Sequence, residues 1–198
     1  MPWLYGEKVR LRASERTDLP TFVRWFADPE FTENLGNQKV MGLADEEAWF
    51  ESMIKGPIDT HVLVIEARIP PNDPNSDMVW QPIGTIAFHD INQNSRSAEI
   101  GIGIGEKAYW SQGYGSDAIR VLLKHGFYTL NFHRIYLRVH ASNARGIRAY
   151  ERVGFIHEGT MREAHFVNGE YQDVHLMSIL RPEWANISSK KGKCNGKY

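Results

Sequence analysis

The sequence is short of cysteine, of long apolar runs and of net charge, and each shortage excludes a class of protein. Its one cysteine, Cys194, cannot form an internal disulfide, which favours a reducing, cytoplasmic location. The longest apolar runs are strand-sized pieces such as residues 61–65, so we expect no membrane span and no export signal. Lysine and arginine number 23 against 24 aspartates and glutamates, a balance that predicts no extended nucleic-acid or membrane surface.

Neither an internal repeat nor a linker interrupts the chain. Its 198 residues, 42% of them hydrophobic, are enough to bury one substantial core. We therefore expect a single domain over residues 1–185. The remaining residues, 186–198, are rich in lysine and glycine and are expected to form a disordered tail.

Two well-known phosphate-binding motifs are also missing. No Gly-Lys-Ser/Thr triplet occurs, which excludes a P-loop, and the glycines at 101 and 103 are followed by Glu106 where a dinucleotide fold needs a third glycine. A different glycine turn is present in the segment Gln112-Gly113-Tyr114-Gly115-Ser116-Asp117-Ala118. It follows a strand-like run over 98–104 and precedes a helix predicted over 117–130. Backbone N–H groups of a glycine turn that opens a helix bind phosphate well.

A second ordered pattern follows this helix. Residues 133–140 alternate as a half-buried strand, Asn143 is placed to cap a helix running to about Arg152, and Gly154 is placed to end that helix. Further on, Asn168-Gly169 is typical of a hairpin turn between two strands. In the front half we expect a strand over 8–12, a helix through Trp25 capped near Asp18, a helix from about Asp45, strands over 61–68 and 83–89, and a proline-rich loop over 69–77.

These two patterns together resemble the GNAT superfamily of N-acetyltransferases. The signature [Gln/Arg]-x-x-Gly-x-[Gly/Ala] matches at Gln112 and Gly115, with Asp117 standing where glycine or alanine is usual. The run Asn143 to Phe155 resembles the second motif, with Gly146 where alanine or serine is usual. The resemblance covers most of residues 6–181, and the acid at 117 together with the C-terminal Asn-Gly-x-Tyr-Gln-Asp-Val resembles the RimJ/RimL-type ribosomal-protein branch and the spermidine acetyltransferases.

The resemblance implies an α+β fold with three layers: a mixed, mostly antiparallel sheet with a splayed pair of strands, and helices on both faces. It implies acetyl-CoA as cosubstrate and no metal. Asp117 would direct its carboxylate away from the pyrophosphate, toward solvent, and tight helix packing is an equal alternative for the glycine face of the central strand. The residues implied to bind the cofactor are Ile102, Gly103 and Ile104 on that strand, Gln112, Gly113, Tyr114, Gly115, Ser116 and Asp117 in the turn, and Asn143.

The chemistry implied is direct acetyl transfer to an amine in a ternary complex, without a covalent enzyme intermediate. Tyr150 aligns with the tyrosine that protonates the departing thiolate, and a phenol is a proton donor at neutral pH. Glu99 is the candidate base for the amine, and the alternative for it is an ion-paired glutamate. Asn143 has the alternative role of a helix cap alone. The histidines show no metal-ligand spacing.

The acceptor is left open between a protein N-terminal amine, which the resemblance favours, and a polyamine or an aminoglycoside. The resemblance places helices of residues 14–55 over the acceptor site. Acids in this region would suit a polyamine, and the alternative for them is a solvated face or helix-start charges; they are Asp28, Glu30, Glu33, Asp45, Glu46 and Glu47. A non-catalytic acetyl-CoA-binding module is a further alternative. A homodimer is possible, with an interface near residues 171–180.

Overall fold

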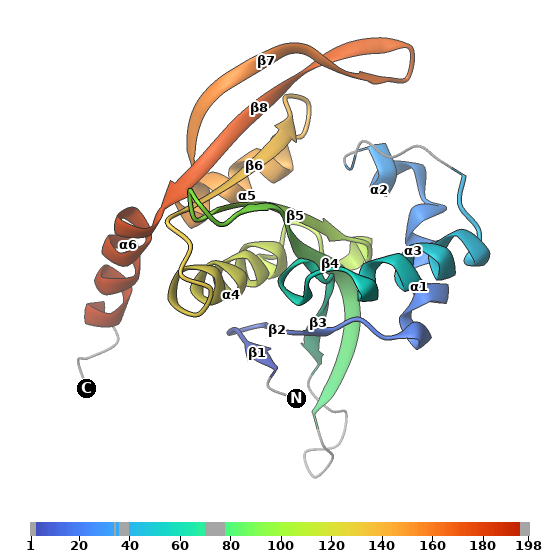
Figure 1. Cartoon of the computed structure of the whole chain (residues 1–198), viewed down its shortest axis with the longest axis horizontal. Coiled ribbons are helices and arrows are strands. Elements are labelled where there is room, and N and C mark those ends of the chain that lie inside the picture. Colours follow the sequence, from blue (N-terminus) through green and yellow to red (C-terminus); the bar gives the residue numbers. More distant parts are fainter. Residues whose placement is uncertain (1–2, 34, 36–39, 70–77, 195–198) are drawn as a thin grey trace. The chain divides into compact units, whose positions relative to one another are not determined.

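The computed structural model describes residues 3–33, 35, 40–69 and 78–194 (Figure 1). The proline-rich loop expected over 69–77 lies outside the described residues, apart from its first residue. The chain forms two compact units, Met1–His89 with Ile100–Leu122 and Asp90–Glu99 with Leu123–Tyr198. The chain passes from one unit to the other within strand β4, within strand β5 and within helix α4. No linker separates the two units. The single domain expected over residues 1–185 stays a prediction.

The first unit combines an antiparallel set of strands with three short helices. Strands β1 (Leu4–Tyr5), β2 (Val9–Ala13), β3 (Leu63–Ile69) and β4 (Val79–Asn92) pair in that order. Helices α1 (Leu19–Phe26), α2 (Pro29–Glu33) and α3 (Leu43–Lys55) lie between β2 and β3 in the chain, and α1 packs on both others (Figure 1). Short 3-10 turns occupy η1 (Arg16–Asp18), η2 (Ile58–Thr60) and η3 (Lys107–Tyr109).

The core of these helices is aromatic, as their sequence pattern predicts. Its buried members are Leu19, Phe22, Trp25, Phe31, Phe50 and Val64. Each buried large side chain contributes about 1.5–3 kcal/mol to the free energy of unfolding. At the start of α1 the Asp18 carboxylate accepts from the Glu15 N–H at 2.8 Å and from both guanidinium ends of Arg12 at 2.7 Å. Asp18 therefore occupies the N-cap position of α1, as expected, but its carboxylate holds the preceding turn η1 and accepts no N–H of the helix. Helix α2 was not predicted.

Strand β5 (Ser97–Ile104) and helix α4 (Tyr114–Tyr128) connect the first unit to the second. β5 pairs in parallel with β6 (Arg134–His140) over Ser97–Glu99, and β5 itself continues five residues beyond the last of these pairs. β6 pairs antiparallel with β8 (Glu170–Leu180), which pairs antiparallel with β7 (Ile156–Val167). The strand order is β1-β2-β3-β4-β5-β6-β8-β7, a mixed and mostly antiparallel sheet, as expected.

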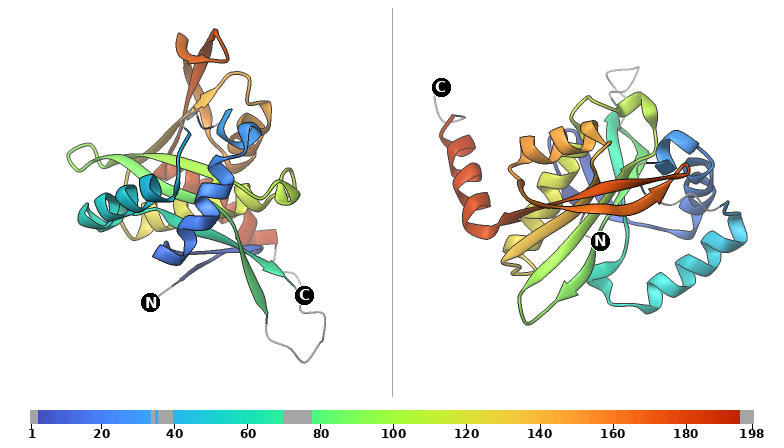
Figure 2. Two further views of the ribbon diagram at one scale, coloured as in Figure 1. Left: turned by 90° about the vertical axis from the view of Figure 1, so that its right-hand side faces the viewer. Right: turned by 90° about the horizontal axis from the view of Figure 1, so that it is seen from above.

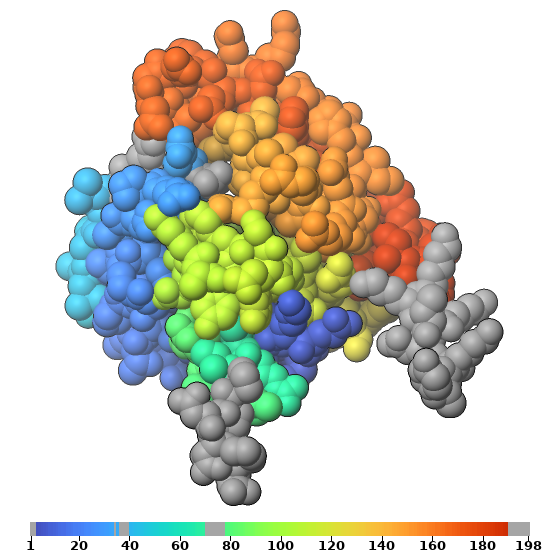
Figure 3. Space-filling view, turned by 180° about the vertical axis from the view of Figure 1, so that it is seen from behind, coloured from blue at the N-terminus to red at the C-terminus, as the bar shows by residue number. Residues whose placement is uncertain are grey.

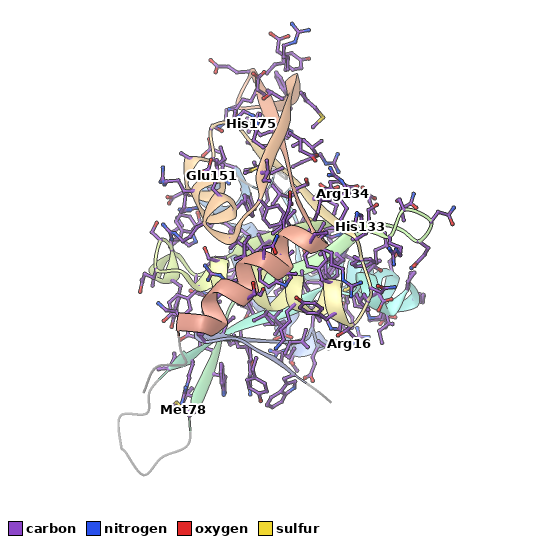
Figure 4. The ribbon with its side chains drawn as sticks, turned by 90° about the vertical axis from the view of Figure 1, so that its left-hand side faces the viewer. Arg16, Met78, His133, Arg134, Glu151 and His175 are labelled. Carbon is purple, nitrogen blue, oxygen red and sulfur yellow. The ribbon has the colours of Figure 1, made fainter. Side chains whose placement is uncertain are left out.

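The hairpin of β7 and β8 turns at Asn168 and Gly169, whose φ angles are 51° and 85°. Two successive positive φ angles are what a tight two-residue hairpin turn requires, which confirms the turn predicted there. Arg134, labelled in Figure 4, forks to the Glu158 carboxylate and donates to the Ser178 hydroxyl at 2.9 Å. This contact joins β6, β7 and β8 and lowers the pKa of Glu158 to about 2.

The C-terminal segment differs from its prediction. Helix α6 (Arg181–Cys194) follows β8 directly (Figure 2), so residues 186–194 are helical rather than disordered. Its first turn is held by the Glu183 carboxylate, which accepts from the Leu180 N–H at 2.8 Å, and Trp184 packs on Phe127. These two contacts involve residues 180–184, which precede the predicted tail. The composition of residues 186–198 therefore does not reveal them. Among the helices described, none has both the length and the apolar character of a membrane span.

Candidate active site

The central strand β5 presents two different faces in the first unit. A Cβ atom added at Gly103 would lie 2.9 Å from the Phe31 ring, and one added at Gly101 would lie 2.8 Å from His89. At Gly103 the neighbour is a helix side chain, as in the helix-packing alternative, whereas the neighbour of Gly101 belongs to strand β4. The other face carries Ile102 and Ile104, whose side chains reach Gly115 of α4. Strand and glycine turn are thus held together by direct contact.

The glycine turn has the geometry of an anion site at a helix N-terminus. Gly113 has a φ of +88° and precedes α4, and the first helical hydrogen bond runs from the Asp117 N–H to the Gly113 carbonyl at 2.9 Å. The N–H groups of the three residues before Asp117 consequently have no partner within the helix, and they carry the positive end of its dipole. Those residues are Tyr114, Gly115 and Ser116, all in the predicted phosphate-binding turn.

The turn is braced by its neighbours. The Trp110 indole N–H donates to the Ile104 carbonyl at 2.7 Å, and the Gln112 side-chain amide donates to the Ala108 carbonyl. The Tyr109 and Tyr114 rings meet edge to face at 5.0 Å. The Gln112 side chain is thus engaged by the backbone beside the turn, and binding of the cofactor by Gln112 stays a prediction.

Asp117 corrects one prediction. Its carboxylate was expected to point to solvent, but the residue is only 5% exposed and Oδ2 accepts from the backbone N–H groups of Lys8 at 2.7 Å and Val9 at 3.1 Å. A Cβ added at Gly6 would lie 2.5 Å from the same oxygen. The acid at this motif position therefore ties β2 to α4, and the contact spans 109 residues of sequence.

In the second unit, helix α5 (Ala144–Val153) carries two of the predicted residues. The Asn143 side chain accepts from the Gly146 N–H at 2.8 Å, which confirms the cap; binding of the cofactor by Asn143 stays a prediction. A Cβ at Gly146 would come within 2.8 Å of that side chain, which accounts for glycine at this motif position. The helix ends at Gly154, whose φ is +115°, as predicted.

Tyr150 is half-buried on α5, and its ring meets Phe155 edge to face at 5.9 Å. Burial raises the pKa of the Tyr150 phenol to about 12, because the charged phenolate loses hydration. Among the described residues the structure shows no hydrogen bond to its hydroxyl. Tyr150 is therefore a fully protonated donor at neutral pH, as the proposed acid must be.

Glu99 lies near the start of β5 and is 8% exposed. Its two oxygens accept from the Arg138 guanidinium on β6 at 2.8 and 2.7 Å. This two-point ion pair raises the pKa of Arg138 through hydrogen bonding with Glu99. A buried carboxylate that accepts two hydrogen bonds from one guanidinium is ion-paired, so the geometry matches the ion-paired alternative for Glu99. Sequence reasoning did not single out Arg138, although its place on the alternating strand was a signal.

The predicted site residues are divided between the two units of the chain. Ile102, Ile104 and the glycine turn contact one another in the first unit, whereas Asn143, Tyr150 and Glu99 belong to the second. In the described part of the chain, no three His, Cys, Asp or Glu side chains gather so as to hold a metal ion.

The first unit also contains a pocket of about 230 Å³ that sequence reasoning did not define. It is walled by α1–α3, by strand β4 and by the residues that precede α3 and β3, and its lining residues are Phe22, Trp25, Phe26, Phe31, Met41, Glu46, Trp49, Val62 and Thr85. Glu46 is 3% exposed, and burial raises the pKa of its carboxyl, assisted by the negative charge of Asp45. The pocket is therefore an aromatic chamber with one carboxyl group in its wall.

The class of protein follows from these features and from the match to known families. Residues 8–156 match the model of the acetyltransferase (GNAT) domain family, and the chain belongs to that family. It is an N-acetyltransferase. Its glycine turn at the start of α4 offers three backbone N–H groups without a helical partner and the positive end of a helix dipole, features that suit a phosphate; binding of the coenzyme A pyrophosphate there stays a prediction.

Within this family the chain is similar to acetyltransferases named for two different kinds of acceptor. The spermidine N(1)-acetyltransferase of Vibrio cholerae is 32% identical over 189 residues, covering 92% of this chain and 99% of the relative. A crystal structure of the Vibrio cholerae spermidine N-acetyltransferase in complex with CoA and spermine has a TM-score of 0.79 and 28% identity, covering 91% of this chain and 100% of that one. The ribosomal-protein-serine acetyltransferase of Escherichia coli is 33% identical over 98 residues, covering 50% of this chain and 54% of the relative. The ribosomal-protein branch expected from the motifs is thus not singled out.

Proposed function

We propose that this protein transfers acetyl from acetyl-CoA directly to a primary amine of a polyamine of the spermidine type. The observation that carries the choice of acceptor is the aromatic pocket with Glu46 in its wall. A polyamine is a flexible polycation with apolar methylene links, and aromatic faces together with a carboxylate bind such a chain. The likeness of the whole chain to a spermidine acetyltransferase supports the same choice.

Three other acids of this region have partners of their own. Asp28 and Glu30 each accept from the Lys107 ammonium at 2.7 Å, and the Asp45 carboxylate accepts from the Gly42 N–H at 2.8 Å to cap α3. These acids match the helix-start and solvated alternative. The structure shows no hydrogen bond or ion pair to the Glu46 carboxylate among the described residues. Glu46 is therefore a buried acid of this region whose carboxylate remains available to an ammonium group.

The reaction needs a bound donor, a neutral amine and a hydrogen-bond donor for the leaving sulfur. Acetyl-CoA supplies the activated acetyl group as a thioester. The amides of Tyr114, Gly115 and Ser116 hold its pyrophosphate, and the Tyr150 hydroxyl donates a hydrogen bond to the departing sulfur. Because Glu99 is engaged by Arg138, we assign removal of the amine proton to water, with Glu99 and Arg138 orienting it.

Thiol release from acetyl-CoA tests the proposal with three acceptors: spermidine, a peptide with an N-terminal serine, and an aminoglycoside. The expected result is a kcat/KM for spermidine at least about tenfold above that for either alternative, a preference worth ~1.4 kcal/mol. A preference for the peptide would favour the ribosomal-protein type of acceptor instead. Absence of turnover with CoA binding intact would favour the non-catalytic module.

The role of Glu46 has a matched control on the same helix. Glu46→Gln removes the buried charge, whereas Glu47→Gln removes an exposed one. We expect Glu46→Gln to raise KM for spermidine by about 10- to 100-fold, as loss of one charged contact does, and Glu47→Gln to leave it within twofold. In the wild type, spermidine affinity should fall as pH drops through the raised pKa of Glu46, and this dependence should vanish in Glu46→Gln. Equal effects of both variants would remove Glu46 from recognition.

A further inference from the structure

The short loop between β1 and β2 places a lysine beside the glycine turn. Its backbone is fixed: the Gly6 N–H donates to the Val9 carbonyl at 2.8 Å, and the Lys8 carbonyl accepts from the Arg68 N–H at 3.0 Å. The Lys8 N–H donates to the Asp117 carboxylate at 2.7 Å. Both polar groups of the Lys8 backbone are thus bonded, so the direction in which its side chain leaves the loop is set by the fold.

The Lys8 side chain lies over the turn itself. Its Nζ donates to the Gln112 carbonyl at 2.9 Å and stands 5.2 Å from the centre of the Tyr114 ring. A Cβ added at Gly113 would lie 4.0 Å from the same nitrogen. In Figure 3 the dark-blue N-terminal residues lie against the yellow-green surface formed by the segment around residue 110. A fixed positive charge therefore stands next to the amides that face the phosphate.

The charge of Lys8 is not used by a neighbouring acid. The nearby Asp117 carboxylate is occupied by two backbone N–H groups, and the structure shows no ion pair to Lys8 among the described residues. The ammonium group has three hydrogens, and the Gln112 carbonyl takes one. Two donors and a full positive charge remain at an exposed position beside the turn.

We propose that Lys8 is a coenzyme A-binding residue that contacts the pyrophosphate held by the Gly113–Ser116 turn. Asp117 acts as its positioning residue, because its carboxylate holds the loop that carries Lys8 against the start of α4. This inference rests on the proposed use of acetyl-CoA. It also gives a physical reason for an acid at the motif position where glycine or alanine is usual: the acid docks a second cationic element onto the loop.

Calorimetry with CoA tests the assignment on the whole chain. Lys8→Met keeps the apolar stem and removes the charge, and Lys124→Met removes an exposed charge from the same helix that the turn opens. We expect Lys8→Met to weaken the Kd for CoA by about 10- to 150-fold, the range of one charge-assisted hydrogen bond, with Lys8→Arg restoring most of it. Lys124→Met should stay within twofold of the wild type. A Lys8→Met Kd that equals that of the control would overturn the inference.

Two further measurements distinguish a direct contact between Lys8 and the pyrophosphate from an indirect effect of the substitution on the turn. A direct contact is screened by salt, so the deficit of Lys8→Met should shrink as NaCl rises from ~0.05 to ~0.5 M, whereas a misplaced turn would bind poorly at every salt concentration. The deficit should persist with 3′-dephospho-CoA, and its loss there would assign Lys8 to the 3′-phosphate and overturn the pyrophosphate contact. Wild-type protein that binds no CoA would instead refute the use of acetyl-CoA itself.

Discussion

Tyr150→Phe separates hydrogen-bond donation from every other role of this tyrosine. The substitution removes only the hydroxyl and retains the ring that packs on Phe155. No described side chain loses a hydrogen-bond partner, because the structure shows none for this hydroxyl. A change in turnover is then attributable to the reaction rather than to the fold.

The expected magnitude follows from the raised pKa. Complete proton transfer from a phenol of pKa about 12 to a thiolate of ordinary pKa ~8.5 is uphill by roughly 3.5 pH units, or about 5 kcal/mol. Tyr150 should therefore act by donating a hydrogen bond to the leaving sulfur rather than by giving up its proton early. Such a charge-assisted hydrogen bond stabilises by about 1.5–3 kcal/mol, which corresponds to ~10- to 150-fold in kcat.

The assay is single-turnover acetyl transfer to spermidine, followed by thiol release, with the Kd for CoA measured separately. We expect the single-turnover rate constant to fall ~10- to 150-fold and the Kd for CoA to change less than about threefold. The pH profile of the wild type should show no alkaline limb from Tyr150 below pH ~11, since its pKa is raised. Unchanged single-turnover rates in Tyr150→Phe would refute the reasoning, as would a weakened Kd that accounts for the whole loss.

Two other substitutions separate structural from catalytic roles in the second unit. Asn143→Ala removes the cap on the Gly146 N–H and should lower the free energy of unfolding by about 0.5–2 kcal/mol, measured by urea denaturation. A large change in the Kd for CoA with unchanged stability would instead indicate that Asn143 binds the cofactor. Glu99→Gln breaks the two-point ion pair with Arg138 and should lower the melting temperature while leaving the shape of the pH–rate profile intact. Disappearance of the acidic limb of that profile would instead indicate that Glu99 is the general base.

Local signals in the sequence predicted the elements around α5 well. Asn143 as cap, Gly154 as terminator and Asn168-Gly169 as hairpin turn each depend on residues that lie within a few positions of one another. The mixed, mostly antiparallel sheet followed from the resemblance that those motifs carry. Such features need no knowledge of distant contacts.

The errors have the opposite origin. The partners of the Asp117 carboxylate, the N–H groups of Lys8 and Val9, lie more than a hundred residues away in the chain. Local sequence patterns do not reveal such partners, and Asp117 was therefore expected to face solvent. α6 was missed because composition favours disorder, while Trp184 finds Phe127 across the fold. The pocket around Glu46 was equally hidden, since its aromatic walls come from three separate helices. Long-range packing decides all three.

A competition in one tube tests the choice of acceptor most directly. Acetyl-CoA is limiting, spermidine and a peptide with an N-terminal serine are present at equal concentration, and mass spectrometry identifies the acetylated product. Recognition by the pocket around Glu46 predicts monoacetylated spermidine, with the peptide unmodified until the polyamine is consumed. Acetyl on the peptide N-terminus while spermidine remains unmodified would contradict it.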